Sequence, residues 1–502
     1  MSFRKSVEFA AEQNPDKPFL WCHGKSYTYG EALKIKDNFS ESFGRFDHIA
    51  IVSNSGDISY LSIFAAVVLK ATYMHLNIDW GPNRLADVLG QATPDLVVCH
   101  REWAIDHTDA FRILGYEVVP AYDPTDAFFS RLTVFRKRDK QNDCLADYKL
   151  KKGVEDILYV MFTSGSTGLP KGVPIDVTSA ALYAQSMVET YSIDQYEQWM
   201  QPVDLHFDVS MMTVLPAWIT SGHIIAIPSK QSPFGPRFVK KFPTAANWTS
   251  VPSVIARSNA LGMLKENVMP GLKRSFFCGE ALPSDMAATW AAAAPRSSVY
   301  NLYGPTEATI ALSWYKFDKT VDQEPVVPIG KALPGSKMRL AKDGEIELGG
   351  PQVFHGYLGN PQKIETYLEV EEDGTRWYKT GDIGHMSDAG VMHFKGRKDW
   401  QVKVRGYRVE VEGVEAAIRK ITDSSLVAVV PVDEVSKSSF DRLCAFVEPG
   451  VDTKNLKSEL GQILPDYMVP SLILELADFP KNANGKIDRN TLVSFAEKES
   501  EK

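Results

Sequence analysis

The sequence predicts an α/β fold with a large N-terminal lobe of parallel-sheet α/β subdomains, a β-rich subdomain, and a small mobile α+β domain at the C-terminus. Three observations predict it. Short continuous apolar runs alternate with helical patterns through the first half of the 502 residues. Beyond about residue 330 the strand-like runs become short and turn-bounded, and a compact unit of about 105 residues then ends the sequence.

In the first half, four apolar runs are typical of strands buried on both faces of a parallel sheet. They are Ile49–Ser53, Leu96–Cys99, Ile157–Met161 and Ile224–Pro228. The stretch Tyr60–Thr72 between the first two runs predicts a buried helix. Its most apolar part, Leu61–Leu69, is too short to cross a membrane, so we expect no membrane insertion.

In the second half, Glu345–Leu348 and Val391–Phe394 predict short strands of the β-rich subdomain, and Gly396–Arg408 is a basic, strand-like segment. The C-terminal unit then shows a helix, two strands and a second helix, at Val411–Ile421, Leu426–Val430, Cys444–Val447 and Leu456–Leu464. We therefore predict an N-terminal core over residues 1–396, a hinge over 397–399 and a small domain over 400–502.

Composition excludes some classes of function. The formal net charge of −8 argues against a general nucleic-acid binder, which needs a basic surface to displace counterions. The five cysteines are scattered, which predicts neither a disulfide framework nor a cysteine zinc site. Met1–Glu8 lacks the apolar run of a secretory signal. These observations favour a cytoplasmic protein.

The segment Thr163–Gly172, Thr-Ser-Gly-Ser-Thr-Gly-Leu-Pro-Lys-Gly, directly follows a predicted buried strand. Its glycines and hydroxyl side chains allow backbone N–H and Oγ groups to converge on phosphate oxygens, and Lys171 adds a positive charge. It is not a Walker A loop. A flexible linker has similar composition, but a linker need not follow a buried strand and end in Pro-Lys-Gly.

Four further motifs are weaker when each is taken alone. Asn301–Glu307, Asn-Leu-Tyr-Gly-Pro-Thr-Glu, combines a tyrosine suited to a purine with a carboxylate suited to Mg²⁺, although Tyr-Gly-Pro alone indicates a turn. Tyr378–Asp382 ends in a carboxylate that can accept the hydroxyls of a ribose. Gly396–Asp399 precedes Val402–Gly406, and Asn482–Arg489 carries a lysine on an Asn-Gly turn.

Together, the five motifs stand in the order and at roughly the separations of the adenylate-forming superfamily, which includes acyl-CoA synthetases, firefly luciferases and adenylation domains of nonribosomal peptide synthetases. The chain resembles that superfamily from Ser26–Leu33 to Arg489. Phe207–Ser210 and Asn484–Asp488 are similar to amino-acid-activating members. Phe277–Glu280 strengthens a likeness to stand-alone D-alanine–carrier-protein ligases.

The resemblance implies ATP and Mg²⁺ as cofactors and assigns roles to particular residues. Lys486, Thr306 and Arg397 are implied to be catalytic, Glu307 to ligate the metal, and Asp399 to be the hinge. The residues implied to hold the nucleotide are Thr163, Ser164, Gly165, Ser166, Thr167, Gly168, Lys171, Gly279, Glu280, Asn301, Tyr303, Gly304, Thr306, Asp382, Arg397 and Lys486.

For the acid to be activated, the resemblance implies a small amino acid, with D-alanine or a residue of similar size as the leading candidate. Asp208 would pair with the α-ammonium group, and it could otherwise cap the predicted helix Val209–Trp218. The implied pocket walls are Val209, Met212, Ser250, Val251, Cys278, Leu302 and Ile310.

The sequence does not identify the acceptor of the acyl group. An amino-acid ligase would use the phosphopantetheine thiol of a carrier protein in trans, because the sequence shows no carrier domain. An acyl- or aryl-CoA ligase would use CoA, and an amide synthetase an amine. A non-enzymatic adenylate-binding homologue is disfavoured because Lys486, Glu307 and Asp382 are retained.

One segment departs from the pattern of the family. Leu69–Asp79, Leu-Lys-Ala-Thr-Tyr-Met-His-Leu-Asn-Ile-Asp, lacks the expected glycine pair, and Trp80-Gly-Pro replaces the usual Tyr-Pro turn. We interpret both as scaffold positions. The departure therefore affects only how closely the chain is related to a characterised group of the family, and it leaves the predicted chemistry unchanged.

Overall fold

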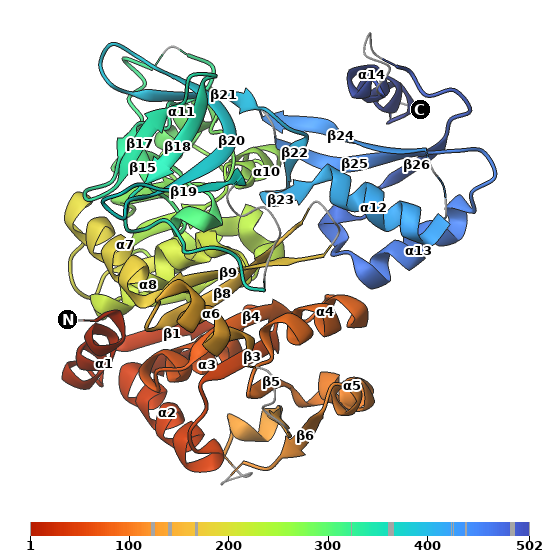
Figure 1. The fold of residues 1–502 in the computed structure, drawn as a ribbon. Coiled ribbons are helices and arrows are strands. Elements are labelled where there is room, and N and C mark those ends of the chain that lie inside the picture. The colour runs from red at the N-terminus through yellow and green to blue at the C-terminus, as the bar shows by residue number, and fades with distance from the viewer. Residues whose placement is uncertain are drawn as a thin grey trace.

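The computed structural model describes residues 2–121, 126–138, 143–165, 169–322, 324–359, 366–422, 424, 426–436, 439–481 and 487–500. Two large sheets and a smaller β-rich sheet form the N-terminal lobe, and a separate sheet with its own helices lies beside them (Figure 1). This confirms the predicted mixed α/β fold. None of the helices in these ranges combines the length and apolarity needed to span a bilayer.

The first large sheet has the strand order β6-β7-β5-β3-β4-β8-β9. Its centre is parallel, as the continuous apolar runs predict, and its edges are antiparallel. The strands are β3 (His48–Ser53), β4 (Thr72–Asn77), β5 (Leu96–His100), β6 (Tyr116–Val119), β7 (Leu132–Lys137), β8 (Ile157–Thr163) and β9 (Lys171–Asp176). The helices of this region are α2 (Tyr29–Phe43), α3 (Asp57–Val68), α4 (Pro82–Ala92), α5 (Arg101–Ile113) and α6 (Cys144–Lys152), with the short helix η1 (Phe129–Arg131).

The second large sheet has the order β16-β15-β14-β13-β12-β10-β11-β1-β2, with parallel pairing from β1 to β14. Its strands are β1 (Pro18–Cys22), β2 (Lys25–Thr28), β10 (Gln198–Gln201), β11 (His223–Ala226), β12 (Ala245–Ser250), β13 (Arg274–Phe277), β14 (Ser298–Tyr303), β15 (Ser313–Lys316) and β16 (Lys331–Ala332). Its helices are α1 (Phe3–Gln13), α7 (Val177–Thr190), α8 (Met211–Ile219), α9 (Gly235–Lys241), α10 (Ser253–Ala260) and α11 (Ser284–Ala293), with η2 (Asp208–Ser210), η3 (Ser229–Phe234) and η4 (Thr306–Ala308).

The β-rich subdomain is an antiparallel sheet of β17 (Lys337–Leu340), β18 (Glu345–Gly349), β19 (Leu368–Val370), β20 (Arg376–Met386) and β21 (Met392–Arg397). The C-terminal sheet contains β22 (Gln401–Val404), β23 (Tyr407–Glu410), β24 (Val427–Ser436), β25 (Ser439–Val447) and β26 (Leu472–Glu475). It carries α12 (Val411–Thr422), α13 (Thr453–Ile463), η6 (Asp466–Met468) and α14 (Arg489–Ser500). The domain boundary at 397–399 and the mobility of this unit stay predictions.

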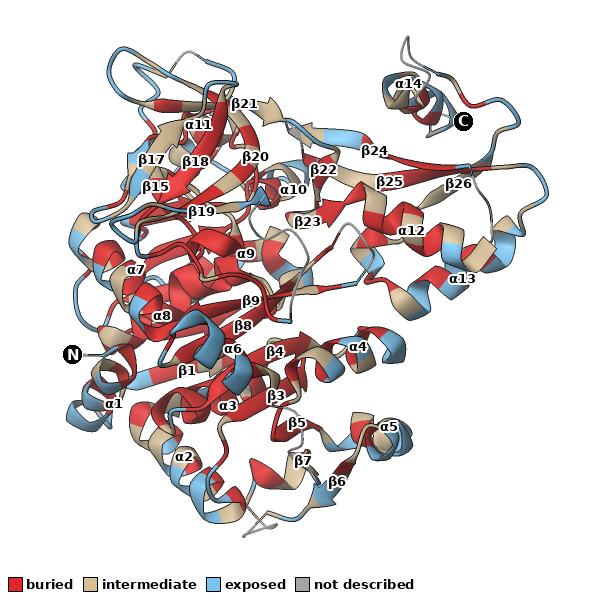
Figure 2. Cartoon of the chain, in the orientation of Figure 1, coloured by how far each residue is buried: buried red, intermediate tan, exposed pale blue. Residues whose placement is uncertain are grey.

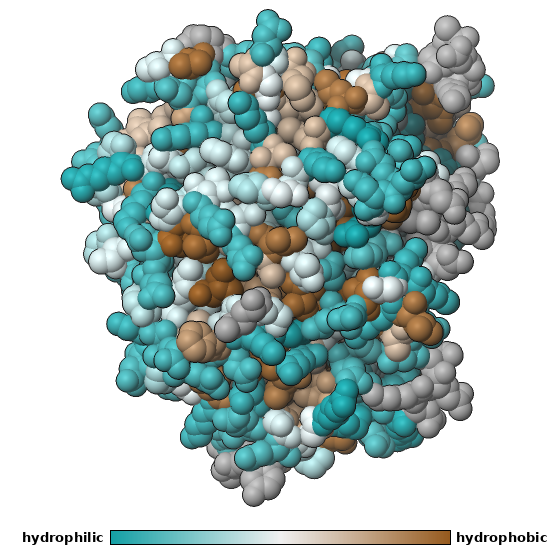
Figure 3. Space-filling model, turned by 60° about the vertical axis from the view of Figure 1, so that its left-hand side comes forward, coloured by the Kyte–Doolittle hydropathy of each residue, from teal (hydrophilic) through white to brown (hydrophobic). Residues whose placement is uncertain are grey.

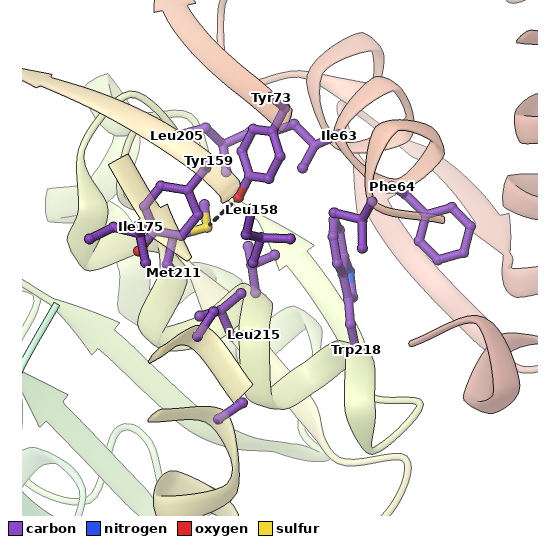
Figure 4. Close-up of a cluster of buried hydrophobic side chains, with 14 of the residues drawn as sticks. Ile63, Phe64, Tyr73, Leu158, Tyr159, Ile175, Leu205, Met211, Leu215 and Trp218 are labelled. Atoms are coloured by element: carbon purple, nitrogen blue, oxygen red, sulfur yellow. Dashed lines mark hydrogen bonds between the residues drawn. The ribbon is translucent and has the colours of Figure 1, made fainter. Parts of the chain in front are cut away.

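The apolar side chains form several cores, and the C-terminal unit has cores of its own. One core fills the interface between the two large sheets, where Tyr73 and Tyr159 pack against Met211 and the ring of Trp218 lies near Phe64 (Figure 4). The central strands of both large sheets are almost wholly buried, while edge strands such as β2 and β6 are partly exposed (Figure 2). Two further cores contain only residues beyond 400. The face in Figure 3 is mostly hydrophilic with scattered apolar side chains.

Two local expectations need correction. The helix expected over Tyr60–Thr72 runs from Asp57 to Val68, because Lys70 adopts a left-handed φ of 63° and Thr72 already begins a strand. The basic segment before Arg408 is a hairpin of β22 and β23. Its two turn residues, Arg405 and Gly406, both have positive φ, as the turn that suits a tight hairpin requires.

Candidate active site

Two cavities lie side by side between the large lobe and the β22–β23 hairpin. Gly279, Gly304, Pro305, Lys403 and Arg408 line both of them. The carboxyl ends of the parallel strands β13 and β14 point toward this place, since Gly279 lies two residues after the end of the first and Gly304 directly follows the second. Ligands of open α/β sheets bind at such strand ends.

The first cavity contains most of the residues predicted to hold adenosine. Its walls include Gly279, Glu280, Asn301, Tyr303, Gly304, Asp382 and Arg397. The Asn301 side-chain amide donates to the carbonyl oxygens of Val327 and Pro328, at 3.1 and 3.0 Å, which fixes its orientation at the wall. A flat cavity wall with a fixed amide and a tyrosine ring suits a purine.

Asp382 and Arg397 stand directly opposite each other on the antiparallel strands β20 and β21. The Arg397 guanidinium donates to Asp382 Oδ1 at 2.5 Å and to Asp399 Oδ1 at 2.7 Å, and the Tyr303 hydroxyl donates to Asp382 Oδ2 at 2.5 Å. Gly381 has a left-handed φ of 76°, which favours glycine, and a Cβ there would lie 2.7 Å from the Arg397 Nη2 atom. The predicted ribose residues and the predicted hinge residue therefore form one ion-pair network.

Glu307 directly follows Thr306, a wall residue of the second cavity, and is fully buried. Arg408 donates to both of its carboxylate oxygens, at 3.0 and 2.8 Å, and the Tyr357 hydroxyl donates at 2.7 Å. Burial alone would raise the pKa of this carboxyl, but the Arg408 charge and the Tyr357 hydrogen bond hold the pKa below its usual value. Glu307 is thus an ionised carboxylate, which suits a divalent cation by its chemistry.

The predicted phosphate loop begins at the end of β8. The Ser164 hydroxyl donates to the Arg408 carbonyl oxygen at 2.8 Å and accepts from the Glu410 N–H at 3.2 Å. Thr163 and Ser164 line the second cavity, Gly165 follows them, and the Lys171 ammonium lies 5.4 Å from the centroid of the Tyr357 ring. Ser166, Thr167, Gly168 and Lys486 lie outside the described residues.

Asp208 contributes a carboxylate to the second cavity. The residue is buried, and its Oδ2 atom has no hydrogen-bond partner within the described part of the chain. Burial raises the pKa of Asp208 to about 6, and a hydrogen bond with Thr306 opposes that shift. Neither η2 nor α8 has a side-chain cap, so the helix-cap interpretation finds no support here.

The other residues predicted to surround the substrate divide into two groups. Val209 lines the second cavity with Thr306, and Leu302 lines the first. The remaining five are buried close by but line neither cavity. They are Met212, Ser250, Val251, Cys278 and Ile310.

Sequence reasoning singled out the segment Val402–Gly406 but assigned no site role to Lys403, Tyr407 or Arg408 of the β22–β23 hairpin. Lys403 reaches both cavities, and burial, together with the nearby Arg408, lowers the pKa of its ammonium group. Tyr407 stacks between His206 of the large lobe and Tyr467 of the C-terminal unit, at centroid distances of 5.8 and 4.1 Å. The alternation of lysine and arginine with valine over Val402–Arg405 is typical of any strand with one solvated face, so this pattern alone did not identify Lys403 as a site residue.

The chain is similar to known proteins over most of its length. Residues 7–358 match the family described as AMP-binding enzyme. The D-alanine–D-alanyl carrier protein ligase of Staphylococcus haemolyticus is 30% identical over 490 residues, which cover 95% of this chain and 96% of that protein. The ligase of the same description from Staphylococcus aureus is 33% identical over 402 residues, covering 76% of this chain and 81% of that protein.

A solved structure has the same overall fold. The Vibrio cholerae adenylation domain AlmE, in complex with glycyl-adenosine-5'-phosphate, superposes with a TM-score of 0.85. The two sequences are 26% identical, and the alignment covers 98% of this chain and 97% of that one.

Proposed function

Since the chain belongs to the AMP-binding enzyme family, we propose that it activates a small amino acid as an aminoacyl-adenylate and transfers the aminoacyl group to the phosphopantetheine thiol of a separate carrier protein. The chain is an adenylate-forming ligase, and ATP is its co-substrate. The observation that carries the amino-acid part of the proposal is the buried Asp208 carboxylate, whose Oδ2 atom is unpartnered in the second cavity.

In the first half-reaction, the substrate carboxylate attacks the α-phosphorus of ATP. The new bond joins a carboxylate oxygen to this phosphorus, and the bond to the β-phosphate oxygen breaks to release pyrophosphate. Both reactants are anions, so catalysis requires neutralised charge and alignment. Asp382 and Arg397 hold the ribose, Asn301 and Tyr303 the adenine, and Thr306 the α-phosphate. Lys486 bridges the attacking carboxylate and that phosphate.

Mg²⁺ fits the chemistry of this site through the ionised Glu307 carboxylate. The ion supplies positive charge to the phosphates when it is bound. In the orientation described here, Arg408 and Tyr357 occupy the carboxylate oxygens of Glu307. Binding of Mg²⁺ at Glu307 therefore belongs to an arrangement in which Arg408 has withdrawn.

The second half-reaction exchanges the adenylate for a thioester. The thiolate sulfur forms a bond to the acyl carbon, and the bond from that carbon to the phosphate oxygen breaks to release AMP. The hairpin arrangement supports this assignment, because Lys403 and Arg408 lie at the junction of the cavities and Gly406 packs against Val251. Rotation about Asp399 would bring the Lys486 turn in for adenylation and the hairpin in for transfer.

The substrate we favour is D-alanine or an amino acid of similar size. The relatives named as D-alanyl carrier protein ligases support it, and glycine belongs in the same test because AlmE holds a glycyl-adenylate. A buried, unpaired carboxylate is costly beside an uncharged acyl chain, which disfavours an acyl-CoA ligase. Pockets distinguish one methylene by only about 1–3 kcal/mol, so size alone leaves close homologues in competition.

The test is ATP–pyrophosphate exchange with D-alanine, L-alanine, glycine and propionate. We expect the amino acids to support exchange and propionate to fail. Asp208→Asn keeps the shape but removes the charge, and should lower exchange with the best amino acid roughly 10- to 150-fold, the cost of one hydrogen bond to a charged group. If propionate matches the amino acids in the wild type, Asp208 has no ammonium partner and the proposal fails.

A further inference from the structure

Two histidines and a glutamate lie together on the β-rich subdomain, outside both cavities of the active site. His385 of β20 and His393 of β21 are directly opposite in the antiparallel register, and their rings stack with centroids 4.6 Å apart. The His393 Nδ1 atom lies 3.0 Å from Glu324 Oε2. One nitrogen or oxygen from each residue falls within 4.8 Å of the others.

We propose that Glu324, His385 and His393 form a binding site for a divalent ion of the zinc class. Two imidazoles and one carboxylate are a donor set typical of Zn²⁺ and of neighbouring transition metals, and they leave coordination positions open to water. Calcium and magnesium prefer oxygen ligands and fit the pair of imidazoles poorly.

The state of the donors agrees with metal binding. Within the described residues, the Nδ1 atom of His385 is buried and makes no hydrogen bond. Lys395 opposes the approach of a cation, while Glu324 supplies a compensating negative charge.

The geometry needs only a small closure. Tetrahedral zinc with bonds of about 2.0–2.1 Å places its donors about 3.3 Å apart, against the present spread of up to 4.8 Å. The cross-strand register fixes the histidine backbones. Glu324 can supply the movement, because 59% of its side chain is exposed while its carbonyl oxygen is held by the Ser284 hydroxyl at 2.6 Å.

The position gives such an ion a structural consequence. Only Pro325 separates Glu324 from Val326 and Val327, which line the first cavity. His385 and His393 lie on the two strands that carry Asp382 and Arg397. An ion at this place would join the loop behind the adenine wall to the strands of the ribose network. This inference does not depend on which acid or acceptor the enzyme uses.

The experiment titrates Zn²⁺ and Co²⁺ into the full chain by calorimetry and by visible absorption of Co²⁺. All proteins carry Cys144→Ser, since Cys144 alone among the five cysteines is not buried and could add a competing thiolate. His385→Ala/His393→Ala should weaken the tightest binding at least roughly tenfold and remove the metal-dependent rise in unfolding temperature. The matched control is His107→Ala, whose ring stacks on Trp103 far along the chain and which should change neither result.

Glu324→Gln is the second variant. Because the Glu324 side chain is mostly exposed, this substitution should leave the fold intact, and a loss of metal affinity would not be due to unfolding. We expect it to weaken binding roughly tenfold. Binding by the double-histidine variant as tight as that of the parent would overturn the proposal. An equal loss of metal affinity in the His107→Ala control would also overturn it, because the measured binding would then come from histidines across the surface rather than from this site.

Discussion

Gly81→Ala tests whether the described orientation is the one that transfers the acyl group. Gly81 precedes α4 in the segment that departs from the family pattern, and it meets α13 of the C-terminal unit. A Cβ on Gly81 would lie 2.2 Å from the carbonyl oxygen of Gln462. The backbone of Gly81, at φ −59° and ψ 153°, suits alanine without strain. The added methyl group therefore clashes with the C-terminal unit and spares the large lobe.

The expected magnitude follows from the clash. Overpacking costs about 1–3 kcal/mol, and here the cost falls only on the orientation in which α13 meets α4. That penalty corresponds to a decrease of roughly 5- to 150-fold in the population of this orientation. Transfer from a supplied aminoacyl-adenylate to a thiol acceptor should slow by a similar factor. ATP–pyrophosphate exchange should be unchanged, since the proposed function assigns adenylation to another orientation of the C-terminal unit.

The assay measures the two half-reactions separately in single-turnover mode. Gly90→Ala is the matched control, because Gly90 lies in the same helix and an added Cβ there meets nothing within 4 Å. Equal loss of exchange and transfer in Gly81→Ala, with the control normal, would refute the reasoning. An unimpaired transfer rate would refute it too, since α13 would then not pack on α4 during that step.

Three further predictions follow from the site. Lys486→Ala should abolish pyrophosphate exchange but largely spare transfer from supplied adenylate, and equal losses in both would contradict its assigned role. Asp399→Pro should slow the complete reaction more than either half-reaction, because proline fixes φ at the predicted hinge. Asp399→Ala is the control, because it removes the same ion pair with Arg397 without fixing φ. Equal rates in the two variants would argue against a hinge at this residue. Burial raises the pKa of Asp208 to about 6, so the carboxylate loses its charge as pH falls through that value, and KM for the amino acid should rise from pH 7 to pH 5 in the wild type. In Asp208→Asn the KM should not follow that profile, and a matching rise would exclude Asp208 as its source.

Much of the fold was predictable because apolar runs report burial locally. Ile49–Ser53 proved to lie in the central parallel strand β3, and Ile157–Met161 in β8, which pairs in parallel with β4 and antiparallel with β9. Pairings across long sequence separations were not predictable. Strand β1 lies beside β11, with Leu20 opposite Ile224, and nothing in either local pattern specifies that partner.

In the candidate site, too, residues within local motifs could be predicted, whereas residues brought in by tertiary contacts could not. Residues carried by motifs, such as Asn301 and Asp382, converge on one cavity, although their individual roles stay predictions. Lys403 was missed because its place depends on how the C-terminal unit docks, and docking is a property of the tertiary structure. Gly81 was interpreted as scaffold for the same reason, since only the structure brings Gln462 against it.

The contact between Arg408 and Glu307 links the two half-reactions by simple electrostatics. A buried carboxylate that already accepts two hydrogen bonds from a guanidinium has little capacity left for a divalent cation, and two cations at one carboxylate repel each other. Arg408 belongs to the hairpin that also brings Lys403 to the cavities. Docking of the hairpin and binding of Mg²⁺ at Glu307 therefore exclude each other. Under the proposed rotation of the C-terminal unit, docking of the hairpin for transfer removes the charge arrangement that adenylation requires, and the two half-reactions would use different arrangements of the chain.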